Sequence, residues 1–237
     1  MEKTKTEYRN NEIDLYQIRR TFSRDKGLIC GVGVNDADYV VEVKKFDENG
    51  NRYNLWNCPI YKQWKATLRR AYGPEQRIQN SYLGVTVCDE WHIFSNFRKW
   101  YLSQNPPKGW QVEKDIIKIG NKMYCPERCA FVPVEVNNLI LLPKTARIYN
   151  LPLGVTYQYG YSAQCSTLGG KKCKRASTPF EAHIYWCEMK VERFDQVLSK
   201  ALEYLSNGMD TRVINALEQR KNKLLMCISN KEEFVSW

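Results

Sequence analysis

The sequence predicts an α+β protein made of two modules, and three observations carry that prediction. An apolar strand, a Gly-Asn turn, a second strand and a short helix follow one another over residues 111–138. Three short strands separated by glycines come after Pro152, and a long helix begins at Thr178. Short apolar runs bounded by turn residues are typical of strands. We therefore expect a ββα core with flanking helices, plus a three-stranded antiparallel sheet packed on a long helix.

Composition favours a polyanionic partner. The 237 residues are 43% hydrophobic, so a sizeable core is expected, and the net charge is +10. A basic excess of this size favours nucleic acid, although interspersed charges of both signs also fit simple solubilisation. The start of the chain lacks a signal peptide and no apolar run is long enough to span a bilayer, so we expect a cytoplasmic protein with no membrane partner.

The nine cysteines are expected to be reduced thiols buried as small apolar side chains. Cys125 and Cys129 have loose spacing for a zinc knuckle, and Cys58 and Cys88 are far away in the sequence. Two Cys-x-x-Cys pairs would be a strong zinc signal. Zinc is therefore not expected.

The first part of the chain predicts an arm, a hairpin and two helices. Residues 1–29 form a basic arm, or a short helix over 13–22, and residues 39–56 form a hairpin around an Asp-Glu-Asn-Gly turn. Helices are predicted from Pro59 and from Asp89. Their aromatic residues at helical spacing are expected in the core. The first helix also carries a basic face that is either solvated or in contact with phosphates, formed by Lys65, Arg69 and Arg70.

The middle of the chain predicts a compact site for one divalent cation. A strand over 112–117 returns as a strand over 130–132, and Pro133 opens a helix that carries Asn137. An acid at one strand end then faces an amide on the helix. Carboxylate and amide oxygens suit hard cations such as magnesium or manganese, which stabilise charge on a scissile phosphate.

The C-terminal part predicts strands over 153–159, 161–167 and 171–176. Thr178 to Glu181 is a capping box with Pro179 at the first helical position, so a long helix begins there and ends near Gly208. A last helix is expected over 211–228. The predicted modules are therefore an arm at 1–29, a domain at 30–145 and a domain at 150–237.

The central domain resembles the phage HNH (His-Me finger) endonucleases, particularly homing-type members that also carry an Apetala/ethylene-response-like DNA-binding domain. The similarity covers residues 30–142. It rests on Cys58-Pro59-x-Tyr61-x-x-Trp64, Val87-Cys88-Asp89-Glu90-Trp91, Phe94-Ser95-Asn96-Phe97 and the block Glu113–Asn137. The resemblance implies a metal-dependent hydrolase of DNA phosphodiesters with a ββα-metal core, in the cytoplasm of a phage-infected bacterial host.

Carried over by position, Glu113 and Asn137 match the family's metal ligands. Lys114 stands where the family has its general-base histidine, and Asp115 matches the acid that follows. Lys114 acts as a base only if its pKa falls far below about 10.4, and the flanking acids oppose that fall. Asp115 is the alternative base, acting on a metal-bound water. The two histidines, His92 and His183, are expected to be surface or core residues.

The C-terminal domain is similar to the Apetala-like module over residues 151–190. The similarity rests on Leu153-Gly154-Val155, Tyr161-Ser162-Ala163, Thr178-x-x-Glu181-Ala182 and Tyr185. It implies that the sheet enters the major groove of double-stranded DNA. The expected contacts to bases and phosphates come from Tyr157, Gln158, Tyr159, Lys171, Lys172, Lys174 and Arg175.

Three hypotheses remain open at the level of sequence. The first is an HNH-type endonuclease that uses magnesium or manganese. The second is a catalytically inactive, nuclease-derived DNA-binding protein with a regulatory or counter-defence role, which the missing histidine favours. The third is a protein-binding module whose Trp-rich helices bind a protein partner.

Overall fold

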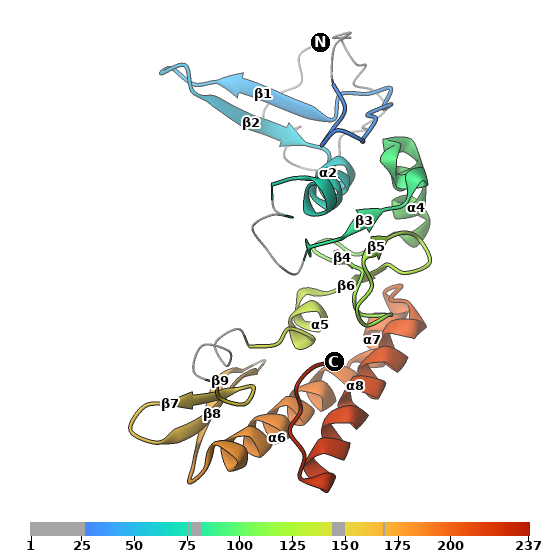
Figure 1. Cartoon of the computed structure of the whole chain (residues 1–237). Helices are drawn as coiled ribbons and strands as arrows, with labels where there is room; N and C mark the ends of the chain where they lie inside the picture. The colour runs from blue at the N-terminus through green and yellow to red at the C-terminus, as the bar shows by residue number, and fades with distance from the viewer. Residues whose placement is uncertain (1–26, 75, 77–81, 144–149, 168) are drawn as a thin grey trace. The chain divides into compact units, whose positions relative to one another are not determined.

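The structure is a computed structural model that describes residues 27–237 except 75, 77–81, 144–149 and 168 (Figure 1). The fold is mixed α+β, and the chain contains two compact units. The first comprises residues 27–105 and 122–127, and the second comprises residues 106–121 and 128–237. Almost all of the predicted arm, and the helix proposed within it, lie outside the described residues. The predicted module boundary falls inside the sequence range of the second unit.

The first unit begins with the predicted hairpin. Strands β1 (Glu42–Phe46) and β2 (Arg52–Asn57) pair antiparallel. The Asp47 carboxylate closes the turn, because its Oδ1 accepts hydrogen bonds from the backbone N–H groups of Asn49 at 2.9 Å and Asn51 at 2.7 Å. Gly50 takes the positive φ of +77° that this turn requires. The sequence prediction is confirmed here.

Two helices and a short parallel strand pair complete the first unit. Helix α2 (Pro59–Tyr72) begins at the predicted proline. The second predicted helix is divided into a 3₁₀ turn η2 (Asp89–His92) and helix α4 (Phe94–Gln104), because Ile93 between them is extended with φ −97° and ψ 124°. Strand β3 (Thr86–Val87) pairs with β5 (Met123–Tyr124).

The aromatic residues of these helices form the core of the first unit, as predicted. Their side chains are fully buried at Trp64, Trp91, Phe94 and Phe97. The Trp64 Nε1–H donates a hydrogen bond of 2.6 Å to the Trp91 carbonyl. A buried indole therefore keeps its donor satisfied, which favours a structural role over base stacking.

The second unit begins with the predicted ββα segment. Strand β4 (Gln111–Glu113) pairs antiparallel with β6 (Ala130–Val132), and helix α5 (Val134–Leu139) follows Pro133. The predicted strand over 112–117 ends early, at Glu113. Its side-chain Oε1 accepts from the backbone N–H groups of Lys114 at 2.9 Å and Asp115 at 2.8 Å, so a turn replaces the strand ladder there.

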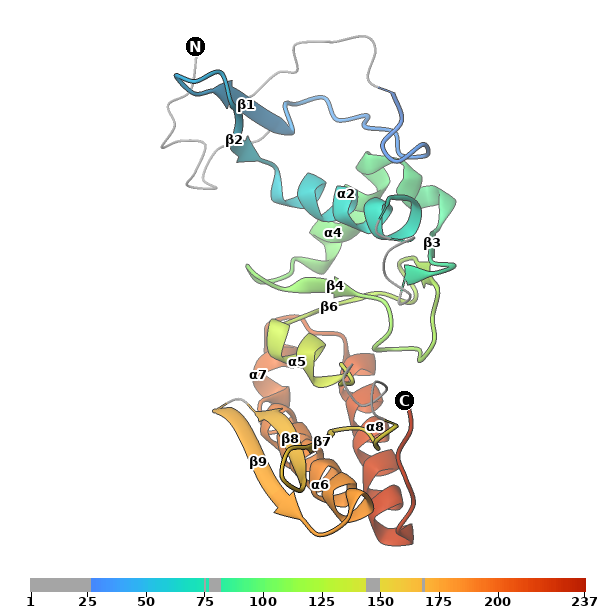
Figure 2. The ribbon, with the colours of Figure 1, turned by 60° about the vertical axis from the view of Figure 1, so that its left-hand side comes forward.

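A three-stranded antiparallel sheet follows, as predicted (Figure 2). Its strands are β7 (Val155–Tyr157), β8 (Tyr161–Thr167) and β9 (Gly170–Ala176), in that order. The sheet packs on helix α6 (Pro179–Leu198) and buries Ala163 and Cys165 against it. The helix start is the predicted cap: Thr178 Oγ1 accepts from the Glu181 N–H at 3.1 Å.

The helical end of the chain differs from the prediction in one respect. Helix α6 ends at Leu198 rather than near Gly208, and the short helix α7 (Ala201–Ser206) occupies the remaining residues. The Ser199 hydroxyl donates to the Gln196 carbonyl at 2.9 Å, a local bond that competes with the helical ladder. Helix α8 (Thr211–Asn230) then packs along α6 (Figures 1 and 2).

The C-terminal residues close the core of the second unit. Phe234 is buried, and its backbone N–H donates to His183 Nε2 at 2.9 Å. Trp237 Nε1–H donates to the Ile140 carbonyl at 2.6 Å. Among the described helices, none combines the length and the apolar character that crossing a bilayer requires.

Candidate functional site

Lys114 is held in place by oxygen atoms of its own unit. Its Nζ lies 2.6 Å from both carboxylate oxygens of Asp115 and 3.0 Å from the Asn121 carbonyl. The Asn121 side chain donates in return to the Lys114 carbonyl at 2.9 Å. Only 3% of Lys114 is exposed. The Lys114 ammonium is therefore engaged in charge-assisted hydrogen bonds within its own turn.

Glu113 is turned toward the backbone of the following turn. The Oε1 atom that binds the N–H groups of Lys114 and Asp115 fixes the carboxyl group there. Burial raises the pKa of the Glu113 carboxyl above its usual range, although the backbone hydrogen bonds oppose that rise. Among its neighbours, Asp115 raises the pKa further and Lys114 lowers it.

Asn137, the other predicted metal ligand, binds a different partner. Its Nδ2 donates to the Gln111 Oε1 at 2.7 Å. The hydrogen bonds therefore do not join Asn137 to Glu113, while the carboxylate of Asp115 is bonded to Lys114. Within the part of the chain that the structure describes, no three His, Cys, Asp or Glu side chains gather around a common point. Each of the two predicted metal ligands, Glu113 and Asn137, therefore has a hydrogen-bond partner of its own in this structure.

Arg220 ties the Glu113–Asp115 turn to helix α8. Its guanidinium donates to the Asp115 carbonyl and to the Ile116 carbonyl, both at 2.7 Å. Arg220 is 4% exposed and belongs to the same unit as the turn. The predicted catalytic segment thus belongs to a polar network that links a turn to helix α8 and stabilises it, while the Asp115 side chain keeps an exposed fraction of 44%.

Both histidines have structural partners. His92 belongs to the first unit, where its Nε2 lies 3.1 Å from the Tyr72 hydroxyl. His183 is fully buried: Nδ1–H donates to the Leu153 carbonyl at 2.8 Å, and Nε2 accepts from Phe234. Burial lowers the pKa of His183, which keeps the imidazole neutral.

The register of β8 and β9 divides the predicted DNA-contacting residues between two faces of the sheet. Lys172 pairs with Cys165 and Lys174 with Ala163, and these two partners are buried against α6. Lys172 Nζ accordingly bonds Glu192 of α6 at 2.5 Å, and Lys174 Nζ lies 3.3 Å from the centre of the Tyr185 ring. Paired residues share a face, so both lysines lie on the helix side.

The opposite face, here called the outer sheet face, is polar and contains no acid. It consists of the side chains that alternate with the buried ones: Thr156, Ser162, Gln164, Ser166, Lys171, Cys173 and Arg175. Lys171 and Arg175 are exposed, and neither side chain makes a hydrogen bond or an ion pair with the described residues. Two unpaired cations therefore stand among hydroxyl and amide groups on one face.

The remaining candidates lie at the turn between β7 and β8. Tyr157 is 64% exposed, with its ring centre 5.0 Å from that of Tyr161, and Tyr159 is 93% exposed with φ +55°. Gln158 is also exposed. Because Tyr157 pairs with Tyr161, two residues from the buried Ala163 pair, the register places it on the helix side and not on the outer sheet face.

The uncharged polar residues of the outer sheet face were not predicted from the sequence. Ser162, Gln164 and Ser166 follow from the alternation along β8, in which Ala163 and Cys165 are buried and their neighbours are not, and Thr156 joins them because it pairs with Ser162. No family model matches the chain, and the comparisons with curated proteins and with solved structures find no match.

Proposed function

We propose that this protein binds double-stranded DNA through the outer sheet face. The observation that carries the proposal is the composition of that face, with Lys171 and Arg175 exposed among hydroxyl and amide side chains and no carboxylate. Lysine and arginine supply affinity for phosphates, and hydroxyl and amide groups donate to phosphates and base edges. A β-sheet of this size fits the major groove. The net charge of +10 supports association with a polyanion.

The proposal favours binding without hydrolysis at the Glu113–Asn137 segment. Three oxygen atoms hold the Lys114 ammonium, and the Asn137 amide donates to Gln111. Of the two nuclease-related hypotheses, the inactive DNA-binding protein is therefore the better supported. A cytoplasmic protein of a phage-infected bacterium remains the expected context, as part of the proposal.

Strand β9 offers a matched pair of variants for the binding test. Lys171→Ala/Arg175→Ala removes two cations from the outer sheet face, and Lys172→Ala/Lys174→Ala removes two from the helix side of the same strand. The measurement is fluorescence anisotropy of a labelled mixed-sequence duplex between about 50 and about 200 mM salt. Removing one cation that touches a phosphate reduces the slope of log affinity against log salt by about 1.

We expect the outer pair to lower affinity and to reduce the slope by about 2, and the helix-side pair to have a smaller effect. Equal effects of the two pairs would contradict the assignment of binding to the outer sheet face. Absent or salt-independent binding of the duplex would contradict the proposal as a whole and favour a protein partner for this unit.

Hydrolysis has a separate test. The wild-type protein, Lys114→Ala and Asn137→Ala are incubated with supercoiled plasmid and either magnesium or manganese. We expect no metal-dependent nicking above background in any of them. Nicking by the wild type that both substitutions abolish would restore the endonuclease hypothesis and overturn the structural role given to Lys114.

A further inference from the structure

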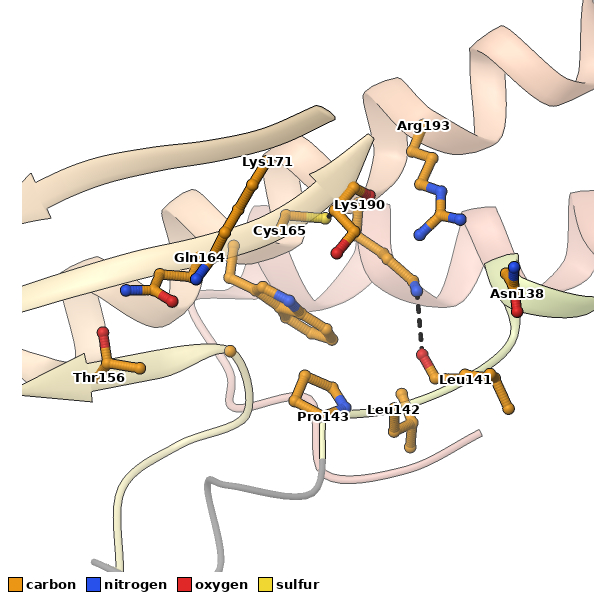
Figure 3. A pocket seen from close by; sticks show the side chains of 13 residues that line it. Asn138, Leu141, Leu142, Pro143, Thr156, Gln164, Cys165, Lys171, Lys190 and Arg193 are labelled. Carbon is orange, nitrogen blue, oxygen red and sulfur yellow. Dashed lines mark hydrogen bonds between the residues drawn. The ribbon is translucent and has the colours of Figure 1, made fainter. Parts of the chain in front are cut away.

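A cavity of about 450 Å³ in the second unit holds buried cations without a counter-charge. It lies beside the end of β8, next to helix α6 and the segment before residue 144 (Figure 3). The 13 lining residues include Lys171, Lys190 and Arg193, and none of them is acidic. The volume is within the range of about 300–1,000 Å³ that small-molecule sites occupy.

Lys190 and Arg193 are buried although both carry charge. Their exposed fractions are 3% and 8%. Both side chains project from α6 toward the segment that contains Leu141 (Figure 3). Lys190 Nζ donates one hydrogen bond of 3.1 Å, to the Leu141 carbonyl, which is a neutral acceptor. The other N–H groups of this ammonium make no hydrogen bond with the described residues.

The charge of Arg193 has even fewer interactions than that of Lys190. Its Nε is buried and has no hydrogen-bond partner, and the Arg193 side chain makes no hydrogen bond or ion pair with the described residues. The nearest acid on the same helix, Glu192, is bonded to Lys172. Buried charges in proteins are ordinarily paired, because removing an ion from water costs several kcal/mol. Two buried cations that have no counter-charge among the described residues therefore indicate a site for an anionic ligand.

The cavity wall supplies neutral hydrogen-bonding groups beside the cations. Thr156, Gln164 and Ser166 line it together with Asn138. Arginine presents a planar set of N–H donors that matches tetrahedral oxyanions, and lysine supplies a compact positive charge. Trp186 closes the apolar side and is 1% exposed, so its ring face is not open for base stacking.

We propose that this cavity is a binding site for a phosphate group, held by Lys190 and Arg193 with Lys171 at its rim. The cavity shares Thr156, Gln164, Ser166 and Lys171 with the outer sheet face, but the two buried cations that carry this inference, Lys190 and Arg193, belong to helix α6 and not to that face. A free phosphate, a nucleotide phosphate and a backbone phosphate share the chemistry that the cavity recognises. The source is distinguished by experiment.

The test is calorimetric titration of the full chain with inorganic phosphate, with adenosine monophosphate and with a duplex oligonucleotide. Lys190→Met and Arg193→Met each remove one cation from the cavity. Lys200→Met removes an exposed cation elsewhere in the unit and is the matched control. Removing one charge-assisted hydrogen bond from such a site weakens affinity by about tenfold or more.

One outcome is saturable binding of phosphate or adenosine monophosphate that both cavity variants weaken and the control variant does not. This outcome identifies a site for free phosphate compounds. Weakening of duplex affinity alone by the same two variants identifies a backbone phosphate. If neither Lys190→Met nor Arg193→Met changes affinity for any of the three probes, the proposal is wrong.

A folding defect in a variant is distinguished from a binding defect by measuring stability first. Thermal unfolding of each variant is measured in a phosphate-free buffer before titration. Lys190→Met removes an unpaired buried charge and is expected to fold at least as stably as the wild type, so its binding defect is attributable to the site. The general stabilising effect of phosphate on folded proteins acts on wild type and variants alike and cancels in the comparison.

Discussion

Replacing Lys190 with methionine is expected to stabilise the protein at neutral pH by an amount that declines as the pH rises. The pKa of Lys190 is lowered from 10.5 to about 8, chiefly by burial and also by the neighbouring Arg193, while Cys165 opposes the change. The ammonium group is therefore less favourable in the folded state than in the unfolded state. Methionine has a similar unbranched chain and no charge.

The magnitude follows from the pKa difference. Below pH 8 the lysine is protonated in both states, and the folded state carries a cost of about 3 kcal/mol, at about 1.4 kcal/mol for each pKa unit. Between pH 8 and 10.5 the unfolded state binds more protons, so wild-type stability rises with pH. The cost vanishes above pH 10.5.

Methionine lacks this dependence, but it also lacks the hydrogen bond to the Leu141 carbonyl. A bond from a charged donor contributes about 1.5–3 kcal/mol, so the net gain at neutral pH is expected to be small. The more sensitive quantity is how the difference in unfolding free energy between the variant and the wild type changes with pH. That difference should fall by about 1.4 kcal/mol per pH unit above pH 8.

The assay is urea unfolding of both proteins followed by tryptophan fluorescence, in phosphate-free buffers between about pH 7 and about pH 9.5, the interval in which Lys190 titrates. Titration of other groups, such as the buried thiols and tyrosines, occurs in both proteins and largely cancels. A difference in unfolding free energy that stays constant over this range would refute the reasoning, because Lys190 would then have an ordinary pKa.

Two further predictions concern the same unit. Gly154→Ala should destabilise it by about 2–5 kcal/mol, because the added Cβ lies 2.0 Å from the Trp186 ring and φ is +77°. The control in thermal unfolding is Gly120→Ala, which has φ +70° and nothing within 4 Å of the added Cβ. It should destabilise the protein by only about 1 kcal/mol. Equal destabilisation by the two substitutions would exclude the steric clash. The lowered pKa of His183 means that stability present above pH 6.5 is lost as the pH falls through the folded-state pKa. His183→Gln should reduce this acid sensitivity in urea unfolding at about pH 7 and about pH 5, and an unchanged pH dependence would contradict the buried neutral state.

Local sequence signals predicted much of the fold because they act over a few residues. Thr178 and Pro179 mark the start of α6, and Asp47 and Gly50 mark the hairpin turn. The strands of the three-stranded sheet follow from runs bounded by glycine. Each of these features depends on backbone preferences and hydrogen bonds within one turn, which neighbouring residues fix.

The predicted metal and catalytic residues show that local sequence signals do not predict side-chain contacts. The spacing from Glu113 to Asn137 indicated a strand–turn–strand–helix segment, and that segment is present. Spacing gave no information about side-chain partners. Glu113 binds backbone N–H groups, and Asn137 binds Gln111. Those choices depend on side-chain rotamers and on Arg220, which approaches from a helix about a hundred residues later in the chain.

The sequence by itself determined the α+β class, the order of strands and helices, and the basic charge of this protein, because composition and short-range periodicity encode them. Only the tertiary structure decided which cations share a surface. The strand register separates Lys171 and Arg175 from Lys172 and Lys174, and the packing of α6 against residues 138–143 encloses Lys190 and Arg193. Function depends on such groupings, and they arise when distant segments pack together, so the order of residues along the chain does not specify them directly.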